Sequence, residues 1–465
     1  MKDMTLERIA ACCGGTYHGS KEAEKQEVTG IAIDSRKVTK GGLFIPICGE
    51  RVDGHSFIPQ VMEQGALCTL SEHPLEEAYQ PYIEVASTTD ALKKIAACYR
   101  QILGIPVVGI TGSVGKTSTK EMIASVLGEK YHVHKTAGNF NNEIGLPLTV
   151  FGLTEEHEAA VLEMGISDFG EMHRLAEIAN PDICVITNIG QCHLENLGTR
   201  DGILRAKTEV FAHLRGPKTV ILNGDDDKLS TVTEVEGKAP ILYTKTEDTR
   251  ENVHAYASDI VPLGMEGIRM TLHLYGESQT VTIPIPGEHN IYNALAAACV
   301  GHAMQMTLPQ ICLGIEKVQT ISGRSNLLHF GSVTVMDDCY NANPVSMKAS
   351  LDVLSQAAGR KVAVLGDMGE LGSRERELHA EAGAYAAKKT DLLLCAGKLS
   401  EEMAHAAEDP GCEVHHYDTR EELTEALLTM IKPQDTILVK ASHFMEYPKV
   451  VEALRHHFES GASQE

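Results

Sequence analysis

The sequence contains no tryptophan, and its aromatic residues together make up only 5% of the 465 residues. It also lacks any apolar stretch close to the roughly 20 residues that a membrane-spanning helix needs. Basic residues are few: 41 Lys and Arg stand against 64 Asp and Glu, which gives a formal net charge of −23. Because this charge repels a phosphate backbone, it argues against nucleic-acid binding. The lack of a long apolar stretch argues against stable membrane insertion.

Zinc-type cysteine spacing is also missing. Twelve cysteines are present, but no Cys-x-x-Cys pair or short Cys/His cluster occurs, which argues against a zinc site. The cysteines are scattered from Cys12 to Cys412, a distribution that favours reduced thiols in a cytoplasmic protein. We therefore expect free cysteines and a cytoplasmic location.

Length and hydrophobic pattern predict three α/β domains, because a domain usually takes roughly 100–200 residues. We assign residues 1–104 to a small α/β domain, 105–317 to a central domain and 318–465 to a third domain. Short apolar runs alternate with helical segments in the central domain, as in a mostly parallel sheet flanked by helices. Residues 254–286 alternate like antiparallel strands at its edge, and the third domain repeats a Rossmann-like strand–helix rhythm.

The clearest motif is a glycine-rich loop between an apolar run at 105–110 and a helical stretch that ends near Glu129. Lys116 could neutralise phosphate charge, and the Thr117 hydroxyl could bind Mg²⁺. The loop is a variant, because Ile110 stands where the usual pattern has its first glycine. The residues predicted to surround the phosphates are Gly112, Ser113, Val114, Gly115, Lys116, Thr117 and Ser118.

Two polar residues follow other strands of the central domain. Glu163 comes directly after the apolar run 159–162, and His193 lies a few residues past the run 183–187. Because carboxyl ends of parallel strands meet at one edge, both would share that edge with the loop. Glu163 could hold Mg²⁺ directly or through water, although either residue taken alone is more often an ordinary surface group.

Lys207 lies on the apolar face of a predicted helix, beside Ile203, Val210 and Phe211. A lysine in this setting usually extends its ammonium to solvent. The alternative is a desolvated amine with a lowered pKa that reacts with carbon dioxide. The resulting carbamate would turn a cation into a metal ligand.

Further candidates lie in polar loops. Asn139 and Asn142 belong to a polar loop of the central domain, and Asn290 begins an Ala-rich helix at 290–302, although asparagine is also a routine turn and cap residue. Arg324 lies after the presumed hinge, and more candidates follow a strand of the third domain, where α/β sheets bind ligands. We expect this domain to close over a nucleotide. The residues after that strand are Asp338, Tyr340, Asn341 and Asn343.

Ordered motifs along nearly the whole chain resemble the Mur ligase family. The blocks 34–36, 42–44 and 49–55 look like the family's UDP-sugar-binding domain, which implies substrate contacts for Ser35 and Arg36. The blocks that follow in family order are 111–120, 136–147, 162–165, 192–198, 206–209, 289–295, 337–344 and 366–372.

The resemblance implies a role for each candidate. Lys116, Glu163, His193 and Lys207 are the implied catalytic residues. Thr117 and Glu163 share a first Mg²⁺ beside the ATP phosphates, and His193 with a carbamylated Lys207 holds a second. The implied nucleotide contacts are Asn290, Arg324 and Asp338, and the implied substrate contacts are Asn139, Asn142, Tyr340, Asn341 and Asn343.

The implied activity is an ATP-dependent amide ligase of peptidoglycan precursor synthesis, acting as a monomer. The block 337–344, and the lack of an Asp-Asn-Pro-Arg block, favour the member that joins D-Ala-D-Ala to UDP-MurNAc-tripeptide through an acyl phosphate. The third peptide residue, Lys or meso-diaminopimelate, stays open. Two departures leave roles undecided: Glu288 and His443 stand where the family often has arginine.

Three alternatives remain. Another Mur or folylpolyglutamate-type ligase would add a single amino acid. A P-loop NTPase or a phosphotransferase would share only the phosphate loop with this chain. The NTPase would hydrolyse ATP without an amine acceptor. A non-catalytic nucleotide-binding module would lose affinity on Lys116→Ala but would have no turnover to lose.

Overall fold

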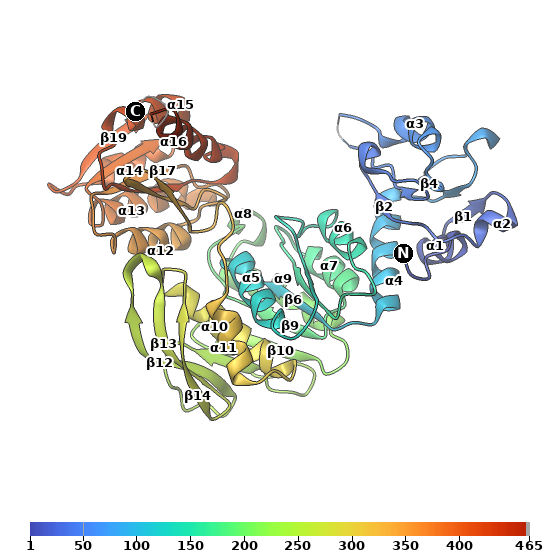
Figure 1. The fold of residues 1–465 in the computed structure, drawn as a ribbon, viewed down its shortest axis with the longest axis horizontal. Helices are drawn as coiled ribbons and strands as arrows, with labels where there is room; N and C mark the ends of the chain where they lie inside the picture. Colours follow the sequence, from blue (N-terminus) through green and yellow to red (C-terminus); the bar gives the residue numbers. More distant parts are fainter. Residues whose placement is uncertain (50, 462–465) are drawn as a thin grey trace.

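The computed structural model describes residues 1–49 and 51–461. Glu50, which belongs to the sequence block 49–55, and the last four residues lie outside this description. Three sheets, each with its own helices, follow one another along the chain. The N-terminal and C-terminal parts lie on opposite sides of the central part (Figure 1). The predicted three-domain α/β fold is confirmed.

The N-terminal sheet has the strand order β1-β5-β4-β3-β2, in which β1 is antiparallel to β5 and the other neighbours are parallel. Helix α1 begins after Thr5, whose side chain accepts a hydrogen bond from the Arg8 amide, and ends at left-handed Gly14. The strands are β1 Thr16–His18, β2 Ile31–Ala32, β3 Leu43–Phe44, β4 Cys68–Ser71 and β5 Tyr82–Glu84, and the helices are α1 Leu6–Cys13, α2 Lys21–Glu24, α3 Ile58–Glu63 and α4 Thr88–Leu103.

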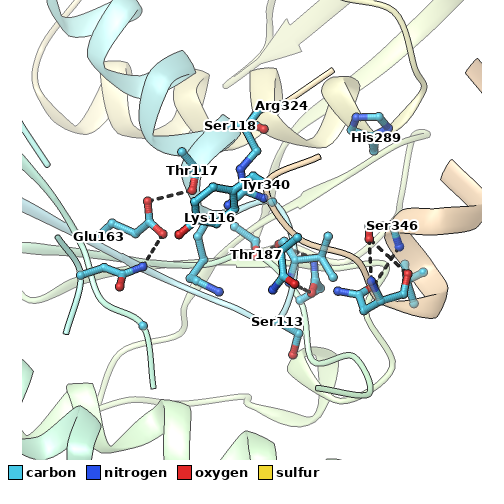
Figure 2. Close-up of a pocket in the computed structure, with 18 of the residues that line it drawn as sticks. Ser113, Lys116, Thr117, Ser118, Glu163, Thr187, His289, Arg324, Tyr340 and Ser346 are labelled. Atoms are coloured by element: carbon cyan, nitrogen blue, oxygen red, sulfur yellow. Dashed lines mark hydrogen bonds between the residues drawn. The ribbon is translucent and has the colours of Figure 1, made fainter. Parts of the chain in front are cut away.

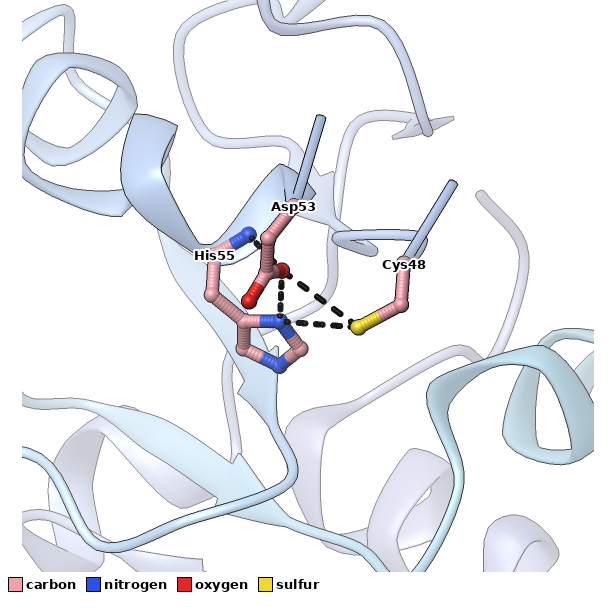
Figure 3. A group of neighbouring side chains, drawn as sticks. All are labelled: Cys48, Asp53 and His55. Atoms are coloured by element: carbon pink, nitrogen blue, oxygen red, sulfur yellow. Dashed lines mark hydrogen bonds and ion pairs between the residues drawn. The ribbon is translucent and has the colours of Figure 1, made fainter. Parts of the chain in front are cut away.

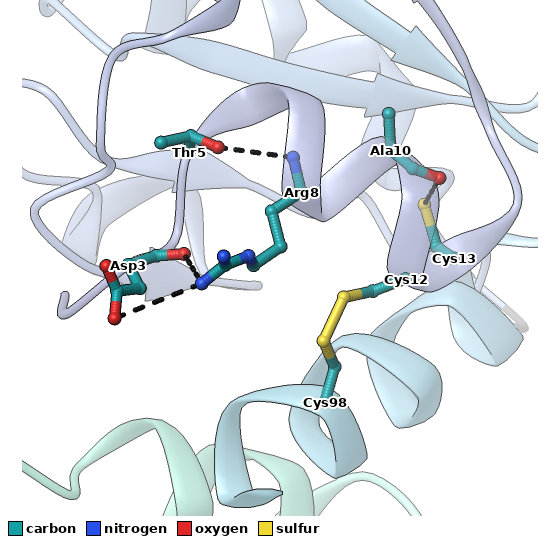
Figure 4. Close-up of a disulfide and its surroundings, with 7 residues drawn as sticks. All are labelled: Asp3, Thr5, Arg8, Ala10, Cys12, Cys13 and Cys98. Carbon is teal, nitrogen blue, oxygen red and sulfur yellow. Dashed lines mark hydrogen bonds and ion pairs between the residues drawn. A yellow bond between two sulfur atoms is a disulfide. The ribbon is translucent and has the colours of Figure 1, made fainter. Parts of the chain in front are cut away.

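A disulfide joins Cys12 on α1 to Cys98 on α4 (Figure 4). The prediction of free cysteines is therefore wrong for this pair, and the other ten cysteines are free. The two residues are 86 positions apart in sequence, but α1 packs on α4 and brings their Cα atoms to 6.1 Å. That separation lies within the usual range for a disulfide. Cysteine spacing alone carried no sign of this packing.

The central sheet has nine strands in the order β14-β13-β12-β11-β10-β9-β6-β8-β7. Strands β6 to β12 pair in parallel, and β13 and β14 extend the sheet as the antiparallel edge that the sequence predicted. The strands are β6 Val107–Thr111, β7 Val133–Lys135, β8 Ala159–Glu163, β9 Ile183–Ile186, β10 Thr219–Asn223, β11 Ile241–Thr244, β12 Val253–Pro262, β13 Ile268–Leu274 and β14 Glu277–Ile283.

Helices bury both faces of this sheet, which explains why its strands read as continuous apolar runs. Val107 and Leu175 of α7 belong to the hydrophobic core on one face, whereas Val108, Ile123 of α5 and Leu295 of α10 belong to the core on the other. The helices of the central part are α5 Lys116–Leu127, α6 Gly145–Phe151, α7 Glu171–Ala179, α8 Leu194–Leu197, α9 Arg200–Thr208, α10 His289–Ala303 and α11 Leu308–Glu316.

Helix α4 fastens the N-terminal part to the back of the central sheet through Arg100, whose side chain is fully buried. The Arg100 guanidinium donates to the carbonyls of Ala179 and Asn180, at 2.9 and 3.1 Å, where α7 ends. It also contacts the Asp182 carboxylate at 3.0 Å. The positive charge therefore meets both the carbonyl end of a helix and a carboxylate.

Replacing Arg100 with alanine should lower the free energy of unfolding by about 3 kcal/mol, because it leaves buried acceptors without their donor. Arg215 still contacts Asp182, so we expect the lower end of the range for a broken buried ion pair. Urea denaturation would measure the loss. The matched control is Lys94→Ala at an exposed position of the same helix, and an Arg100→Ala variant as stable as this control would contradict the prediction.

The third sheet has the order β15-β16-β20-β17-β18-β19. The apolar runs 333–336, 362–365, 392–395 and 436–439 predict four strands, which are confirmed as β16, β17, β18 and β20. Strand β20 lies between β16 and β17. The strands are β15 Asn326–Phe330, β16 Val333–Asp337, β17 Lys361–Gly366, β18 Leu392–Ala396, β19 Glu413–Tyr417 and β20 Thr436–Lys440, and the helices are α12 Pro344–Leu354, α13 Glu375–Ala387, α14 Ser400–Ala406, α15 Arg420–Met430 and α16 Pro448–Gly461.

None of the helices formed by the described residues combines the length and apolar character needed to cross a bilayer. Short 3-10 helices connect several of the larger elements. They are η1 Ser35–Lys37, η2 Gly54–Phe57, η3 Glu77–Tyr79, η4 Glu209–His213, η5 Leu229–Thr231, η6 Gly264–Glu266, η7 Gly372–Arg374 and η8 His443–Met445.

Candidate active site

A cavity of about 680 Å³ lies between the central and third parts of the chain. The glycine-rich loop forms one wall, and residues that follow strands of the third sheet form the opposite wall. Figure 2 shows side chains from both walls around this space. The carboxyl ends of two separate sheets thus face one cavity, where α/β folds place their ligands.

The glycine-rich loop is fastened to the segment after β9. The backbone amide of Val114 donates to the side chain of Asn188 at 2.9 Å, and Lys116 donates to the Gly112 carbonyl at 2.8 Å. Gly112 has φ +146°, and a Cβ there would lie 2.0 Å from the Thr187 hydroxyl, so this position requires glycine. Because α5 begins directly after the loop, its free amides and its dipole also favour an anion here.

Glu163 ends strand β8, and its side chain is only 2% exposed. Its carboxylate accepts a hydrogen bond from the Thr117 hydroxyl at 3.0 Å (Figure 2). It accepts another from the side-chain amide of Asn141 at 2.9 Å. The nearest ammonium, that of Lys120, lies 3.9 Å away. Oriented carboxylate and hydroxyl oxygens beside a phosphate loop fit the ligand preferences of Mg²⁺.

His193 lines the same cavity just before α8. Its Nδ1 lies 2.7 Å from a carboxylate oxygen of Glu370 in the third domain. This contact lowers the pKa of Glu370. With Nδ1 engaged, Nε2 is the His193 nitrogen available to a cation.

Lys207 is 1% exposed on α9, so its ammonium does not extend to solvent. Burial and the charge of Lys116 lower the Lys207 pKa to about 7. Among the described residues, no carboxylate offsets this effect, and the Cys192 thiol alone acts in the opposite direction. The amine is therefore the desolvated kind that the sequence left as an alternative, and a negative group at this position would relieve the repulsion from Lys116.

Asp338 follows β16 and connects three elements of the third domain. Its carboxylate accepts hydrogen bonds from Lys440 at 2.6 Å, from the Ser350 hydroxyl at 2.5 Å and from the Ser325 amide at 3.0 Å. Burial alone would raise the Asp338 pKa, but the Lys440 charge and these hydrogen bonds outweigh it and lower the pKa. Asp338 is thus an ionised acceptor that holds this wall in place.

Arg324 and Tyr340 form the outer part of this wall. The Arg324 guanidinium lies 4.0 Å from the centre of the Tyr340 ring, a cation–π contact. Two asparagines near the cavity accept hydrogen bonds from the backbone that follows them. Asn343 caps α12 and accepts from the Ser346 amide at 2.9 Å, and Asn142 accepts from the Gly145 amide at 2.8 Å. The ordinary interpretation of Asn142 as a turn residue therefore describes part of what its side chain does.

Most candidates predicted from the sequence come together. The lining residues do not include Gly112, Asn139, Lys207 or Asn290. They also do not include Ser35 and Arg36, which belong to the N-terminal part. Buried Asn290 donates instead to the Pro286 carbonyl. The predicted residues that line the cavity are Ser113, Val114, Gly115, Lys116, Thr117, Ser118, Asn142, Glu163, His193, Arg324, Asp338, Tyr340, Asn341 and Asn343.

Sequence reasoning missed several lining residues. Four of them had a usable signal. Thr187 ends the predicted apolar run 183–187 and Asn188 directly follows it, Lys440 directly follows the predicted strand 436–439, and Asn293 lies one helical turn after Asn290. The polar lining residues that were not predicted include Asn141, Thr187, Asn188, His289, Tyr292, Asn293, Ser346, Ser350 and Lys440.

The two departures from the family pattern lie at the surface. Glu288 forms an ion pair with Lys245. His443 is exposed on η8, with its ring centre 5.6 Å from that of Tyr340. Neither residue is among those that line the cavity.

Among the described residues, one group of three His, Cys, Asp or Glu side chains has its metal-ligating atoms within 4.8 Å of one another, and it consists of Cys48, Asp53 and His55 (Figure 3). The Glu72 amide donates to His55 Nε2 at 3.1 Å, which leaves the ring proton on Nδ1. Nδ1 lies 2.7 Å from a carboxylate oxygen of Asp53. The proton between these two atoms occupies the position that a metal would need. We interpret the group as a hydrogen-bonded clamp on this turn.

Three family models match most of the chain. They are "Mur ligase family, catalytic domain" at residues 27–100, "Mur ligase middle domain" at residues 110–301 and "Mur ligase, glutamate ligase domain" at residues 323–443.

Similar relatives include the protein named UDP-N-acetylmuramoyl-tripeptide--D-alanyl-D-alanine ligase in Bacillus subtilis (strain 168), which is 38% identical over 97% of this chain and 98% of its own. The Escherichia coli (strain K12) protein of the same name is 33% identical over 98% and 99%. Among solved structures, MurF from Acinetobacter baumannii has a TM-score of 0.88 at 31% identity, covering 97% and 99%. MurF from Thermotoga maritima in complex with ADP has a TM-score of 0.81 at 30% identity, covering 92% and 98%.

Proposed function

The chain belongs to the Mur ligase family, and from this premise we propose that it is the ATP-dependent ligase that joins D-Ala-D-Ala to UDP-MurNAc-tripeptide. The products are UDP-MurNAc-pentapeptide, ADP and phosphate. Relatives with this activity in their names match nearly the full length. The observation that best supports this proposal is the cavity itself. The phosphate loop and Glu163 line one side of it, and polar residues of the third domain line the other.

The chemistry starts from a carboxylate, which is a poor electrophile. Transfer of the ATP γ-phosphoryl group converts the peptide carboxylate into an acyl phosphate, and the amine of D-Ala-D-Ala then expels phosphate to form the amide. Like charge opposes the first step, because an anionic carboxylate must approach an anionic phosphate. Lys116 and the loop amides offset this repulsion, and the two walls of the cavity exclude water from the acyl phosphate.

We assign Thr117 and Glu163 to a first Mg²⁺, and His193 with a carbamylated Lys207 to a second. Buried, hydrogen-bonded Glu163 and desolvated Lys207 support this assignment. Mg²⁺ bound there would supply positive charge that stabilises the transferring phosphoryl group. The number of ions and the carbamate are parts of the proposal.

Opposite the phosphate loop, Arg324 and Asp338 are our proposed nucleotide contacts, since both line the cavity. Buried Asn290 would act through Asn293, to which it is hydrogen-bonded. The proposed contacts to the peptide substrates are Asn139, Asn142, Tyr340, Asn341 and Asn343.

In the N-terminal part, Ser35 and Arg36 are the proposed UDP-sugar contacts. Arg36 is exposed and held by Asp34, which leaves its guanidinium accessible to an anion. We propose domain limits at 1–104, 105–317 and 318–465, each containing one of the three sheets. The monomeric state and the cytoplasmic location stay predictions.

Phosphate release from ATP tests the function directly. With Mg²⁺ and UDP-MurNAc-tripeptide, release should depend on D-Ala-D-Ala, and mass spectrometry should detect one pentapeptide for each phosphate. Parallel reactions with lysine and meso-diaminopimelate tripeptides would identify the preferred third residue. Release indifferent to both substrates would replace the proposal with an NTPase, and release supported by a single amino acid would favour another ligase of the family.

A further inference from the structure

One contact between the central and third domains joins residues that the proposed mechanism does not connect. His193 Nδ1 and a carboxylate oxygen of Glu370 lie 2.7 Å apart. His193 immediately precedes α8 of the central domain, whereas Glu370 lies in the segment between β17 and η7 of the third domain. The contact therefore forms only when the two domains are held together.

Both residues have an unusual backbone. His193 has φ +52° and Glu370 has φ +61°, in the left-handed region that residues other than glycine seldom adopt. Such conformations persist where the surrounding structure enforces them, and they gather at functional sites. Here two segments distant in sequence each adopt this conformation at the residue where they meet.

The segment that carries Glu370 is held from three directions. The Met368 amide donates to His379 Nε2 at 2.8 Å, and His379 is fully buried on α13. The Gly369 amide donates to the Ser442 hydroxyl at 2.9 Å. Buried Asp367 accepts from the amide and hydroxyl of Ser400, at 2.7 and 2.6 Å. The three residues before Glu370 are thus held in place by hydrogen bonds, and Glu370 does not lie on a freely moving surface loop.

Burial contributes little to the contact itself, because the Glu370 side chain is 60% exposed and that of His193 is 22% exposed. Even when both partners are charged, an exposed pair adds little to folding stability. The hydrogen bonds that hold the segment before Glu370, and the left-handed backbone of both residues, therefore indicate that the contact orients the imidazole of His193. A carboxylate bonded to one ring nitrogen orients the ring and directs the other nitrogen to a metal.

We propose that Glu370 is a positioning residue: it orients His193 for the second metal ion and makes binding of that ion depend on closure of the third domain. This inference rests on the second metal site of the proposed function. Because such coupling is reciprocal, the bound ion must also favour the closed arrangement. Loss of the Glu370 carboxylate should therefore weaken both ion binding and closure.

The test is Mn²⁺ binding to the full-length protein, followed by electron paramagnetic resonance with a non-hydrolysable ATP analogue and bicarbonate present. In Glu370→Gln, the weaker Mn²⁺ site should lose about 10-fold or more in affinity, while the site at Thr117 and Glu163 is unchanged. Small-angle X-ray scattering should show less contraction on Mn²⁺ addition than in the unchanged chain. The matched control is Glu401→Gln, at an exposed position on α14, which should behave like the unchanged chain.

The His193→Ala variant distinguishes failure of the Glu370 inference from failure of the metal site on which it rests. If His193→Ala loses the weaker ion but Glu370→Gln keeps it, the positioning role of Glu370 is refuted and the proposed function stands. If neither variant changes Mn²⁺ binding, the assignment of His193 as a ligand is wrong, and the inference falls with it. The phosphate-release assay judges the ligase activity independently of both results.

Discussion

Lys116→Ala should lower kcat for ADP formation by roughly 10²–10³-fold, the usual cost of removing one preorganised group that stabilises transition-state charge. Lys116 begins α5, and its ammonium now contacts the Gly112 carbonyl of the phosphate loop at 2.8 Å. Bound ATP would place its β- and γ-phosphates within reach of the same ammonium. Because the charge on the transferring group grows as the bond breaks, the loss should fall mainly on kcat.

A coupled assay for ADP would measure this effect, with circular dichroism to show that the variant is folded. Lys130→Ala is the matched control, since Lys130 lies just past the far end of α5 and its ammonium contacts only the Gln305 carbonyl among the described hydrogen-bond partners. A Lys116→Ala variant that keeps a tenth or more of the activity would refute the assigned role. If the unchanged chain shows no turnover at all, the non-catalytic binding module becomes the better interpretation.

Lys207→Ala should abolish measurable ligation and should be partly rescued by a short carboxylate such as acetate or propionate. The expected loss exceeds about 10²-fold, because even residues that only support a metal ligand cost 10–100-fold when removed. The side chain is 1% exposed, and Lys207 is not among the residues that line the cavity. An added acid can occupy the space left by the lysine and return an anionic oxygen to the second metal site.

The carbamate also predicts a pH and carbon dioxide dependence. Burial and the Lys116 charge lower the Lys207 pKa to about 7, so the neutral amine that reacts with carbon dioxide predominates above that value and the inert ammonium below it. Enzyme stripped of carbon dioxide below this pKa should lose activity, and bicarbonate added above it should restore activity. Carbon-13 NMR with labelled bicarbonate would detect the carbamate carbon directly.

Arg205→Ala is the control for both experiments, because Arg205 is an exposed residue of the same helix. It should keep its activity and gain nothing from added acid. If folded Lys207→Ala fails to respond to every carboxylate tested, and no labelled carbamate is seen, Lys207 acts in some other way. The phosphate-loop and Glu163 assignments do not depend on this result.

The order of the three sheets was predictable from local patterns. Strand β6, the glycine-rich loop and α5 form a contiguous unit, so residue types within one short stretch encode it. Strands β15 and β19 were missed, because each is an edge strand of the third sheet whose residues are at most half-buried and form no continuous apolar run. A strand of this kind is defined by its partner more than by its own sequence.

The site was predictable where a single rule applied. Glu163 and Asp338 each follow a buried strand, and parallel strands bring such residues to one edge. The same rule covers Asn188, which directly follows the apolar run 183–187 and holds the phosphate loop, although it was not predicted. The rule does not reach His289, which lines the cavity from the start of α10. The position of His289 depends on how α10 packs, and no spacing in the sequence expresses that packing.

By itself, then, the sequence determined the phosphate loop, the alternation of strands and helices and the family resemblance, since each is carried by neighbouring residues. Only the tertiary structure decided that Lys207 is buried, that Cys12 meets Cys98 and that Glu370 reaches His193. Solvent exposure and long-range contacts are properties of the packed chain. A residue's neighbours in sequence constrain its conformation, but its charge state and its partners depend on which distant surfaces exclude water around it.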